Sequence, residues 1–405
     1  MKITKLVIIT HHFWPENFLI NEIALKFEKK NIQSTVITGL PNYPKGEIFD
    51  KYKKLKTLKK ENFRGLKIIR FPIIPRKKGK FINLVLNYFS YLINGIFFLR
   101  QANLKNKFHH IFVYSTSPIT TALLGIYLKK KYKKKLTLWV QDLWPDSVKN
   151  TGFIKNKFFL YLISLIVKYI YKHSDNIVAQ SKAFKKNIKR YTQKKIKVVE
   201  NSHFNIENRK YKIPEKIKKI LIKNFCVTFS GNIGKAQSIR TILEAAKQIK
   251  HYKKIHIILI GSGSEIELTK LFIKENQLKN ISIFGPYPSG LAFKIIKKSN
   301  ASLLTLKKSL IFSQTIPNKF QTYLFAKKPI IVSADGEVAK LTKKNKVGLV
   351  SNSENPKKLA ANIIKISKFK SLQLKKIKNN CLNFYNKSYN INGQVKKLIK
   401  IMNDE

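Results

Sequence analysis

Two series of short apolar runs, each alternating with helix-length segments, constrain the fold of this chain more than any other feature. The first series comprises residues 6–9, 35–38, 111–114, 136–140, 176–179 and 197–199. The second comprises residues 226–229, 256–260, 281–284, 301–306, 330–332 and 348–350. Apolar runs separated by helix-length segments are typical of parallel strands joined by crossover helices. The sequence therefore predicts an α/β fold with two doubly wound parallel sheets.

A chain of 405 residues also suits two domains of roughly 200 residues each. A polar, Lys-rich stretch that contains Pro214 separates the two series of strands. We expect a first domain over residues 1–205, a connection over 206–222, a second domain over 223–375 and a helical C-terminal segment over 376–405.

The charge balance is extreme, with 81 Lys and Arg against 21 Asp and Glu and a net charge of +60. Only 7 of the basic residues are Arg, the residue that gives bidentate and stacking contacts to nucleic acids. We therefore expect no nucleic-acid partner. A genomic bias toward A and T explains the excess of Lys, and attraction to anionic lipid head groups is the alternative.

The two cysteines, Cys226 and Cys381, form no disulfide framework and match no metal-ligand spacing. A reducing, cytoplasmic compartment is the expectation that follows.

Residues 81–99 form a run of 19 residues without a formal charge, nominally long enough to cross a bilayer. A helix would align Asn83, Asn87, Ser90 and Asn94 in one narrow polar stripe. Amides at the hydrocarbon centre are costly in a lone span, and both flanks are basic. We expect a helix in the membrane interface, with a buried helix and a true span as alternatives. A second aromatic and aliphatic helix, over residues 158–171, would extend this surface.

Polar, aromatic and turn residues follow the first two strands of the chain, at residues 10–17 and 38–46. Asp142 follows the strand at 136–140. An α/β sheet builds its site in loops at the carboxyl ends of its strands, although either loop could be an ordinary connection. Asp142 could polarise an acceptor hydroxyl, or it could cap a helix.

Three motifs carry a resemblance that covers nearly the whole chain. The runs Phe-Trp-Pro-Glu-Asn-Phe, Gly-Leu-Pro-Asn-Tyr-Pro-Lys-Gly and Val-Gln-Asp-Leu-Trp-Pro-Asp-Ser resemble those of family 4 glycosyltransferases. The nearest subgroup is called WbuB-like and is regarded as L-fucosamine (N-acetylfucosamine) transferases of O-antigen or capsule synthesis. The resemblance implies a GT-B fold, in which two Rossmann-like domains face a cleft. It implies acceptor contacts at His12, Trp14, Glu16, Asn17, Asn42 and Tyr43.

The second domain begins with a small-residue loop, Ser-Gly-Asn-Ile-Gly-Lys-Ala-Gln-Ser, between a strand and a helix. Small residues and a helix N-terminus suit a diphosphate, although such a loop can also be a plain tight turn. Family 4 usually has an Arg and a Lys here, where Asn232 and Gln237 stand, and Ser238 replaces a Gly. Lys235 is therefore expected to take over part of the phosphate contact. The resemblance implies donor contacts in this and the next two loops at Gly231, Asn232, Gly234, Gln237, Gly261, Gly263, Phe284 and Gly285.

The segment at residues 314–329 contains Pro317 and Lys319 in what reads as a first helical turn. A Lys there opposes the helix dipole, which favours a phosphate-binding role over a structural one. Family 4 commonly has two glutamates in this segment, where Gln314 and Thr322 stand, so an acidic catalytic pair is not expected. The proposed catalytic residues are Asp142, Lys235 and Lys319, and the remaining donor contacts are Asn318, Gln321, Asp335 and Glu337.

The resemblance implies a glycosyltransferase that retains the anomeric configuration. Since no metal-ligand motif ends a strand, and GT-B enzymes neutralise the leaving diphosphate with basic side chains and helix N-termini, no metal ion or cofactor is expected. The expected donor is a UDP-sugar with an N-acetylated deoxyhexose. The expected acceptor is a polyprenyl-diphosphate-linked sugar, reached by an enzyme peripheral to the inner face of the cell membrane. A UDP-sugar epimerase of the same fold and a nucleic-acid-binding basic protein are the alternatives.

Overall fold

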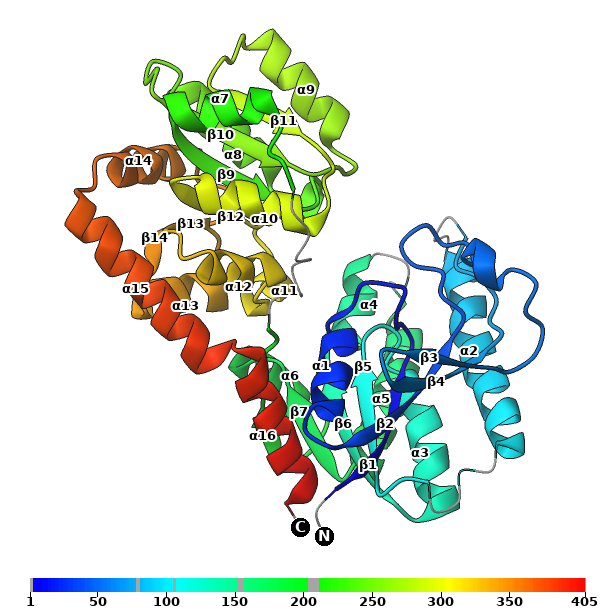
Figure 1. Ribbon diagram of the computed structural model, residues 1–405. Helices are drawn as coiled ribbons and strands as arrows, with labels where there is room; N and C mark the ends of the chain where they lie inside the picture. The colour runs from blue at the N-terminus through cyan, green and yellow to red at the C-terminus, as the bar shows by residue number, and fades with distance from the viewer. Residues whose placement is uncertain are drawn as a thin grey trace. The chain divides into compact units, whose positions relative to one another are not determined.

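The computed structural model describes residues 3–77, 81–102, 104, 107–151, 154, 156–202 and 211–404. The chain forms two compact units, residues 1–201 with 391–405 and residues 202–390. Each unit is an open sheet with helices against it (Figure 1). The predicted boundaries differ in two places. Residues 211–222, expected in the connection, contain nearly all of a helix of the second unit, and the C-terminal segment is divided between the units.

The first unit contains an eight-stranded sheet of order β3-β4-β2-β1-β5-β6-β7-β8. Its strands are β1 (Lys5–Thr10), β2 (Gln33–Gly39), β3 (Lys59–Phe63), β4 (Leu66–Phe71), β5 (His110–Ser115), β6 (Lys135–Val140), β7 (Asn176–Ala179) and β8 (Ile196–Val198). All neighbours pair in parallel except β3, which lies antiparallel to β4 at the edge. Ile8 in β1 is opposite both Val36 and Phe112, so the register buries the apolar runs on both faces.

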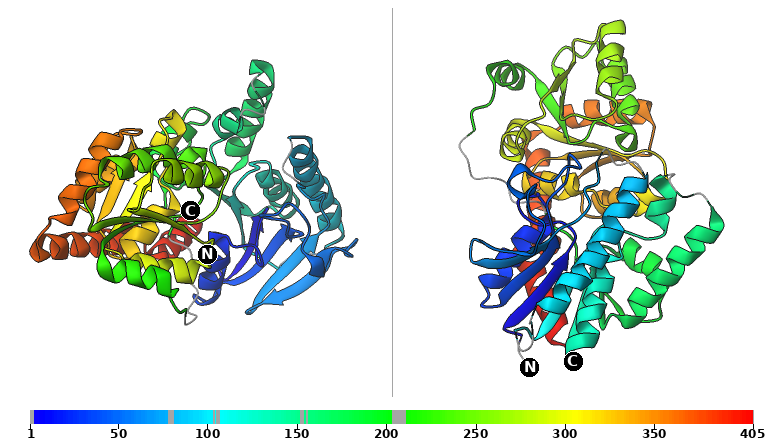
Figure 2. Two further views of the ribbon diagram at one scale, coloured as in Figure 1. Left: turned by 90° about the horizontal axis from the view of Figure 1, so that it is seen from above. Right: turned by 90° about the vertical axis from the view of Figure 1, so that its right-hand side faces the viewer.

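The helices of this unit are α1 (Leu19–Glu28), the short η1 (Asp50–Tyr52), α2 (Phe81–Gln101), α3 (Thr121–Tyr132), α4 (Asp146–Thr151), α5 (Lys157–His173), α6 (Lys182–Ile188) and α16 (Ile391–Asn403). Helix α1 forms because Leu19, Ile23 and Phe27 recur on one face, which packs on the sheet. Helix α16 returns to this unit, where Asn176 Nδ2 donates to Ile401 O at 3.2 Å. In Figure 2, α2, α3 and α5 lie side by side against the sheet.

The second unit contains a six-stranded, wholly parallel sheet of order β11-β10-β9-β12-β13-β14. Its strands are β9 (Phe225–Ser230), β10 (Ile255–Ile260), β11 (Ile281–Phe284), β12 (Ala301–Thr305), β13 (Ile330–Ser333) and β14 (Gly348–Ser351). Its helices are α7 (Glu215–Lys223), the short η2 (Lys235–Gln237), α8 (Ile239–Gln248), α9 (Ile266–Glu275), α10 (Ser289–Lys298), α11 (Leu310–Gln314), α12 (Asn318–Phe325), α13 (Glu337–Lys344), α14 (Pro356–Ser367) and α15 (Ser371–Ser388).

The strand order reverses once in each sheet, between β1 and β5 in the first unit and between β9 and β12 in the second. Ligands of open α/β sheets bind outside the carboxyl ends of the strands at such a switch point. The loops after β1, β5, β9 and β12 therefore flank the two positions where ligands of such sheets bind.

Candidate functional site

In the second unit, the loops after β9 and β10 pack backbone to backbone. Ile233 N donates to Ser262 O at 2.8 Å, and Glu265 N donates to Ile233 O at 3.0 Å. A Cβ added at Gly261 would lie 1.9 Å from Gly231 O, and the φ of Gly261 is +147°. Only glycine fits this approach. The structure thus brings together Gly231, Gly261 and Gly263, three of the residues expected to contact the donor.

Lys319, in the first turn of α12, extends beneath this loop. Its Nζ lies 3.8 Å from the centroid of the Phe229 ring. A Cβ at Gly231 would lie 3.2 Å from the same Nζ. The Nζ is buried and has no hydrogen-bond partner within the described ranges. Burial lowers the pKa of the ammonium group to about 7. An enclosed cation without a partner is costly in the free protein, and an anion bound at the loop would offset that cost.

The remaining residues expected around this loop take more varied positions. Lys235 is exposed in η2, and the side chains of Asn232 and Gln237 approach each other at 3.3 Å. Ser238, which stands where family 4 has Gly, adopts a left-handed conformation with φ +46°. The loop is joined to the end of β12, because Thr305 Oγ1 donates to Gln237 O at 2.5 Å and Lys307 N to Ala236 O at 3.0 Å. These bonds connect the two strands at the switch point.

Several other predicted donor residues form hydrogen bonds within the protein. Phe284 O accepts from Gly261 N at 3.0 Å, whereas Gly285 is exposed beyond β11. Gln321 is buried, and its amide lies 2.8 Å from Pro317 O and 2.9 Å from Asn318 O, at the start of α12. Asp335 and Ser353 exchange two hydrogen bonds, at 3.1 and 3.3 Å, that join the loops after β13 and β14. Glu337 opens α13.

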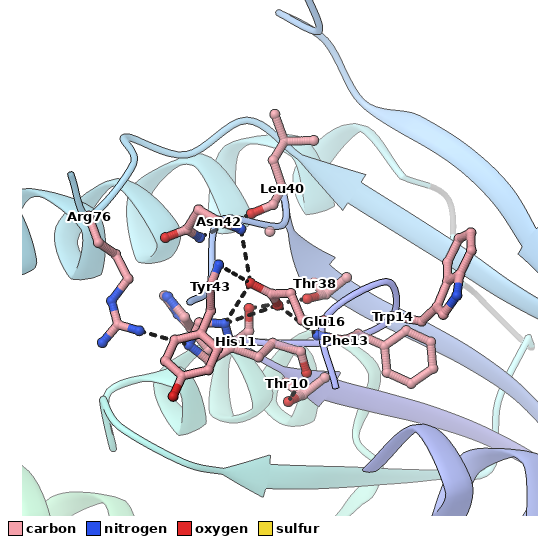
Figure 3. A network of polar contacts seen from close by, with 12 residues as sticks. Thr10, His11, Phe13, Trp14, Glu16, Thr38, Leu40, Asn42, Tyr43 and Arg76 are labelled. Carbon is pink, nitrogen blue, oxygen red and sulfur yellow. Dashed lines mark hydrogen bonds and ion pairs between the residues drawn. The ribbon is translucent and has the colours of Figure 1, made fainter. Parts of the chain in front are cut away.

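In the first unit, Glu16 is the centre of a buried network in the loop after β1 (Figure 3). Its carboxylate accepts from the backbone N–H groups of Phe13, Asn42 and Tyr43 at 3.2, 2.9 and 2.7 Å. It also lies 3.0 Å from His12 Nδ1. The network therefore fixes the two predicted acceptor loops to each other and brings His12, Glu16, Asn42 and Tyr43 together.

Trp14 and Asn17 lie apart from this network. The Trp14 ring stacks on Phe63 of β3, with centroids 4.5 Å apart, and points away from Tyr43 (Figure 3). The backbone carbonyl of Trp14 accepts a hydrogen bond from the buried guanidinium of Arg70, which also forms an ion pair with Glu61 of β3. Asn17 is exposed before α1. Sequence reasoning missed the β3–β4 hairpin that holds Trp14.

Arg76 is a second residue that sequence reasoning left out of the site. Its guanidinium lies 3.4 Å from His12 Nε2 and 5.7 Å from the centroid of the Tyr43 ring. Because His12 Nδ1 faces the Glu16 carboxylate, Nε2 is the acceptor and Arg76 the donor in the neutral ring. Burial, His12 and Arg76 lower the pKa of the neighbouring His11 well below its usual value, and the hydrogen bond that its Nε2 donates to Asn87 Oδ1 opposes this effect.

Asp142 lies in the loop after β6 and accepts a hydrogen bond of 2.5 Å from Ser117 Oγ, in the loop after β5. Ser117 Oγ in turn accepts from Trp144 Nε1 at 2.9 Å. The predicted acceptor-side carboxylate therefore stands one strand away from the switch point of the first sheet and is held by Ser117, which follows β5.

Helix α2 presents its polar stripe to the protein and its apolar residues outward. Asn87 donates to Ile74 O at 2.6 Å, Ser90 accepts from Ile74 N at 2.9 Å and Asn94 donates to Pro72 O at 2.9 Å. Phe89, Ile93 and Phe97, on the other face, are 61%, 61% and 54% exposed. Of the described helices, α2 alone is long and apolar enough to span a bilayer. Because the apolar side chains on this face are exposed and are not packed in the core, the structure disfavours the alternative that α2 is a buried helix.

Comparison with known proteins agrees with this architecture. Residues 212–381 match the family model of the glycosyl transferases group 1. A curated protein of Pseudomonas aeruginosa, described as "Probable glycosyltransferase WbjE", is 23% identical over 253 residues, 60% of this chain and 63% of that protein. This match therefore spans less than two thirds of that relative. An uncharacterized glycosyltransferase of Methanocaldococcus jannaschii is 26% identical over 372 residues, 89% of this chain and 88% of that protein.

Among solved structures, Anabaena Alr3699/HepE in complex with UDP and glucose superposes with a TM-score of 0.66 at 11% identity, over 100% of both chains. Together these findings confirm the predicted GT-B fold and the predicted class of enzyme, a glycosyltransferase. The group 1 match lies over the unit that holds Lys319 and the glycine loops. It favours a transferase over an epimerase.

Proposed function

We propose that the chain transfers a sugar from a UDP-linked donor, with retention of configuration, onto a polyprenyl-diphosphate-linked acceptor. The resemblance to WbuB-like family 4 enzymes suggests an N-acetylated deoxyhexose as the sugar and O-antigen or capsule synthesis as the context. The observation that carries the proposal is the buried, unpartnered ammonium of Lys319 beneath Gly231. HepE, a structural neighbour, binds UDP, whose diphosphate would supply the missing partner.

In the reaction, the bond between the anomeric carbon and the β-phosphate oxygen breaks while the acceptor hydroxyl oxygen bonds to that carbon. The acceptor proton passes to the leaving phosphate, so that UDP and the glycosylated acceptor are the products. Negative charge grows on the diphosphate as it leaves, and Lys319 with the N–H groups of the glycine loops is placed to stabilise it. On this account, transfer requires no metal ion.

The proposed setting is the inner face of the cell membrane, with the enzyme bound peripherally. Helix α5 repeats the pattern of α2: Phe158, Phe159 and Tyr161 are 62%, 55% and 57% exposed. Contiguous apolar faces of this kind are unusual on soluble proteins and mark contact surfaces. The lysine-rich composition would add attraction to anionic lipids.

Incubating the purified protein with membranes and a panel of radiolabelled UDP-sugars tests the proposal. One donor should label the membranes, in EDTA as well as in its absence. Lys319→Ala should slow transfer about a hundredfold, because one preorganised charge is lost. Lys235→Ala should also slow it, whereas Lys279→Ala, at an exposed position away from the glycine loops, should not. Full activity in a folded Lys319→Ala variant would contradict the assignment.

A further inference from the structure

The first unit contains an apolar groove of about 480 Å³ between α2 and α5. Its walls include Val85, Phe89 and Leu92 of α2 and Phe159, Leu162 and Ile166 of α5. A volume of this size lies within the range of ligand pockets. The groove lies beside the start of α3, and it is distinct from the outermost face of α2, where Leu86, Ile93 and Phe97 lie.

One part of the groove lining is polar. Asp142, Ser117, Thr120, Trp144 and Tyr88 line it there, the first three near the switch point of the sheet. The rings of Tyr88 and Trp144 lie 6.2 Å apart. Asp142 and Ser117 are the hydrogen-bonded pair already described. The groove therefore joins an apolar channel to the proposed acceptor side of the enzyme.

A cation stands at this polar region. Burial raises the pKa of the Tyr88 hydroxyl, and the nearby positive charge of Arg76 opposes the rise. Arg76 also contacts His12 and Tyr43, as shown above. Across the described ranges no carboxylate forms an ion pair with Arg76. Its guanidinium contacts His12 and the Tyr43 ring but no carboxylate within these ranges, an arrangement that leaves charge available for an anion.

We propose that this groove binds the hydrocarbon chain of a polyisoprenyl diphosphate and that Arg76, with Tyr88, binds its phosphate. The inference rests on the proposed function, because this lipid would be the anchor of the acceptor sugar. An apolar channel that meets one unpaired cation complements a molecule with a long apolar chain and an anionic head. The head would then lie beside Asp142 on one side and the His12 network on the other.

Binding of farnesyl diphosphate to the full chain, measured by calorimetry without vesicles, tests the proposal. Arg76→Gln should weaken this binding about tenfold, because a charge-assisted contact is lost, and should leave farnesol binding unchanged. Val85→Trp and Leu162→Trp, which fill the groove from opposite walls, should each block both ligands. Ile93→Ser with Phe97→Ser, on the same helix but outside the groove, should leave both ligands bound.

Three outcomes would overturn the groove assignment, and one would leave it standing while the proposed transfer fails. Farnesyl diphosphate binding that neither tryptophan variant reduces would place the ligand elsewhere, provided that thermal unfolding shows at least one of them folded. Binding of inorganic diphosphate as tight as that of farnesyl diphosphate would assign the cation to a free anion. If the groove variants behave as expected but no UDP-sugar is used with any acceptor, the lipid site stands and the proposed transfer fails. If transfer to a soluble acceptor proceeds while farnesyl diphosphate does not bind, the groove proposal fails alone.

Discussion

Lys319 shows how one residue links folding to function. Its ammonium group is buried against Phe229 and has no hydrogen-bond partner within the described ranges, so burial disfavours the charged form. Burial lowers the pKa to about 7, far below the ordinary value for Lys. Between about pH 7 and the ordinary pKa of Lys, the unfolded chain binds more protons at this side chain than the folded chain does. This part of the stability therefore rises with pH over that window, and the site is destabilising when Lys319 is charged and no anion is bound.

UDP binding should reverse this shift, which gives the first prediction. An anionic diphosphate favours the charged ammonium and raises its pKa, so binding at pH 8 should take up close to one proton. Calorimetry in buffers of different ionisation enthalpy measures this uptake. Lys319→Arg, whose guanidinium is always charged, should bind UDP without it. An equal uptake in both proteins would show that another group titrates.

Glu16 illustrates the opposite case, a buried charge whose partners belong to the protein. Glu16→Ala would leave the backbone N–H groups of Phe13, Asn42 and Tyr43 buried without an acceptor. We predict a loss of about 3 kcal/mol or more in the free energy of unfolding, measured with urea. Glu16→Gln should lose less, because the amide oxygen still accepts. Glu47→Ala, exposed on the neighbouring loop, should stay within about 0.5 kcal/mol. A loss no larger for Glu16→Ala than for Glu47→Ala would contradict the network.

At the scale of elements, α2 turns its polar side chains toward the protein and its apolar side chains toward the outside. Its asparagines satisfy the backbone at residues 72–74, and its phenylalanines and isoleucines point outward. Burial against a lipid surface would recover roughly 25 cal/mol for each Å² of apolar area removed from water. This gain does not depend on salt, unlike the attraction of lysines to anionic head groups.

Vesicle binding should therefore depend on the outward face of α2. Replacing Leu86, Ile93 and Phe97 together with Ser should abolish co-sedimentation with anionic vesicles and leave thermal stability nearly unchanged, since all three are exposed. High salt should weaken binding of the unaltered protein only in part. A matched control is Leu268→Ser with Leu271→Ser on α9, which are 65% and 51% exposed. Unfolding of the triple variant would mean that another surface covers this face.

The elements that the sequence predicts well are those whose residues carry a one-sided or fully apolar pattern. The buried strands are of this kind, because both faces of a parallel strand require Val, Ile or Leu. Strand β3, Lys-Lys-Glu-Asn-Phe, lacks such a run and is held at the sheet edge by the pairing of Glu61 with Arg70. The many Lys residues of α7 made this segment resemble a polar connection in the sequence, although Ile217 is fully buried. The local pattern of apolar residues predicts only elements that are extensively buried. Strand β3 and helix α7 instead depend on contacts with distant parts of the chain.

The same division applies to the candidate site. The position of a loop after a predicted strand places Gly231, Gly261 and Asp142 at the carboxyl ends of strands, and this position is readable from the sequence. Arg76 follows Pro75 in an irregular segment without any strand or helix signal, so only the folded chain brings it to His12 and Tyr88. The enclosure of Lys319 against Phe229 joins residues 90 positions apart, which no spacing rule predicts.

At the scale of the whole molecule, each unit places its polar groups at its own switch point. The second unit holds glycine loops and a buried cation, which suit a nucleotide diphosphate. The first holds the Glu16 network, Asp142 and an apolar groove, which suit an amphiphilic acceptor. This division of chemistry between two Rossmann-like units is the basis of the proposed transfer.

The most direct test of that account is the fate of the sugar in a single reaction mixture. The purified chain, a UDP-sugar and lipid extracted from bacterial membranes should yield one UDP for each sugar added to the lipid, measured by mass spectrometry of the organic phase and by assay of UDP. Lys319→Ala should reduce both products equally. Sugar that remains on the nucleotide with an altered configuration, and an organic phase without any added sugar, would contradict the account.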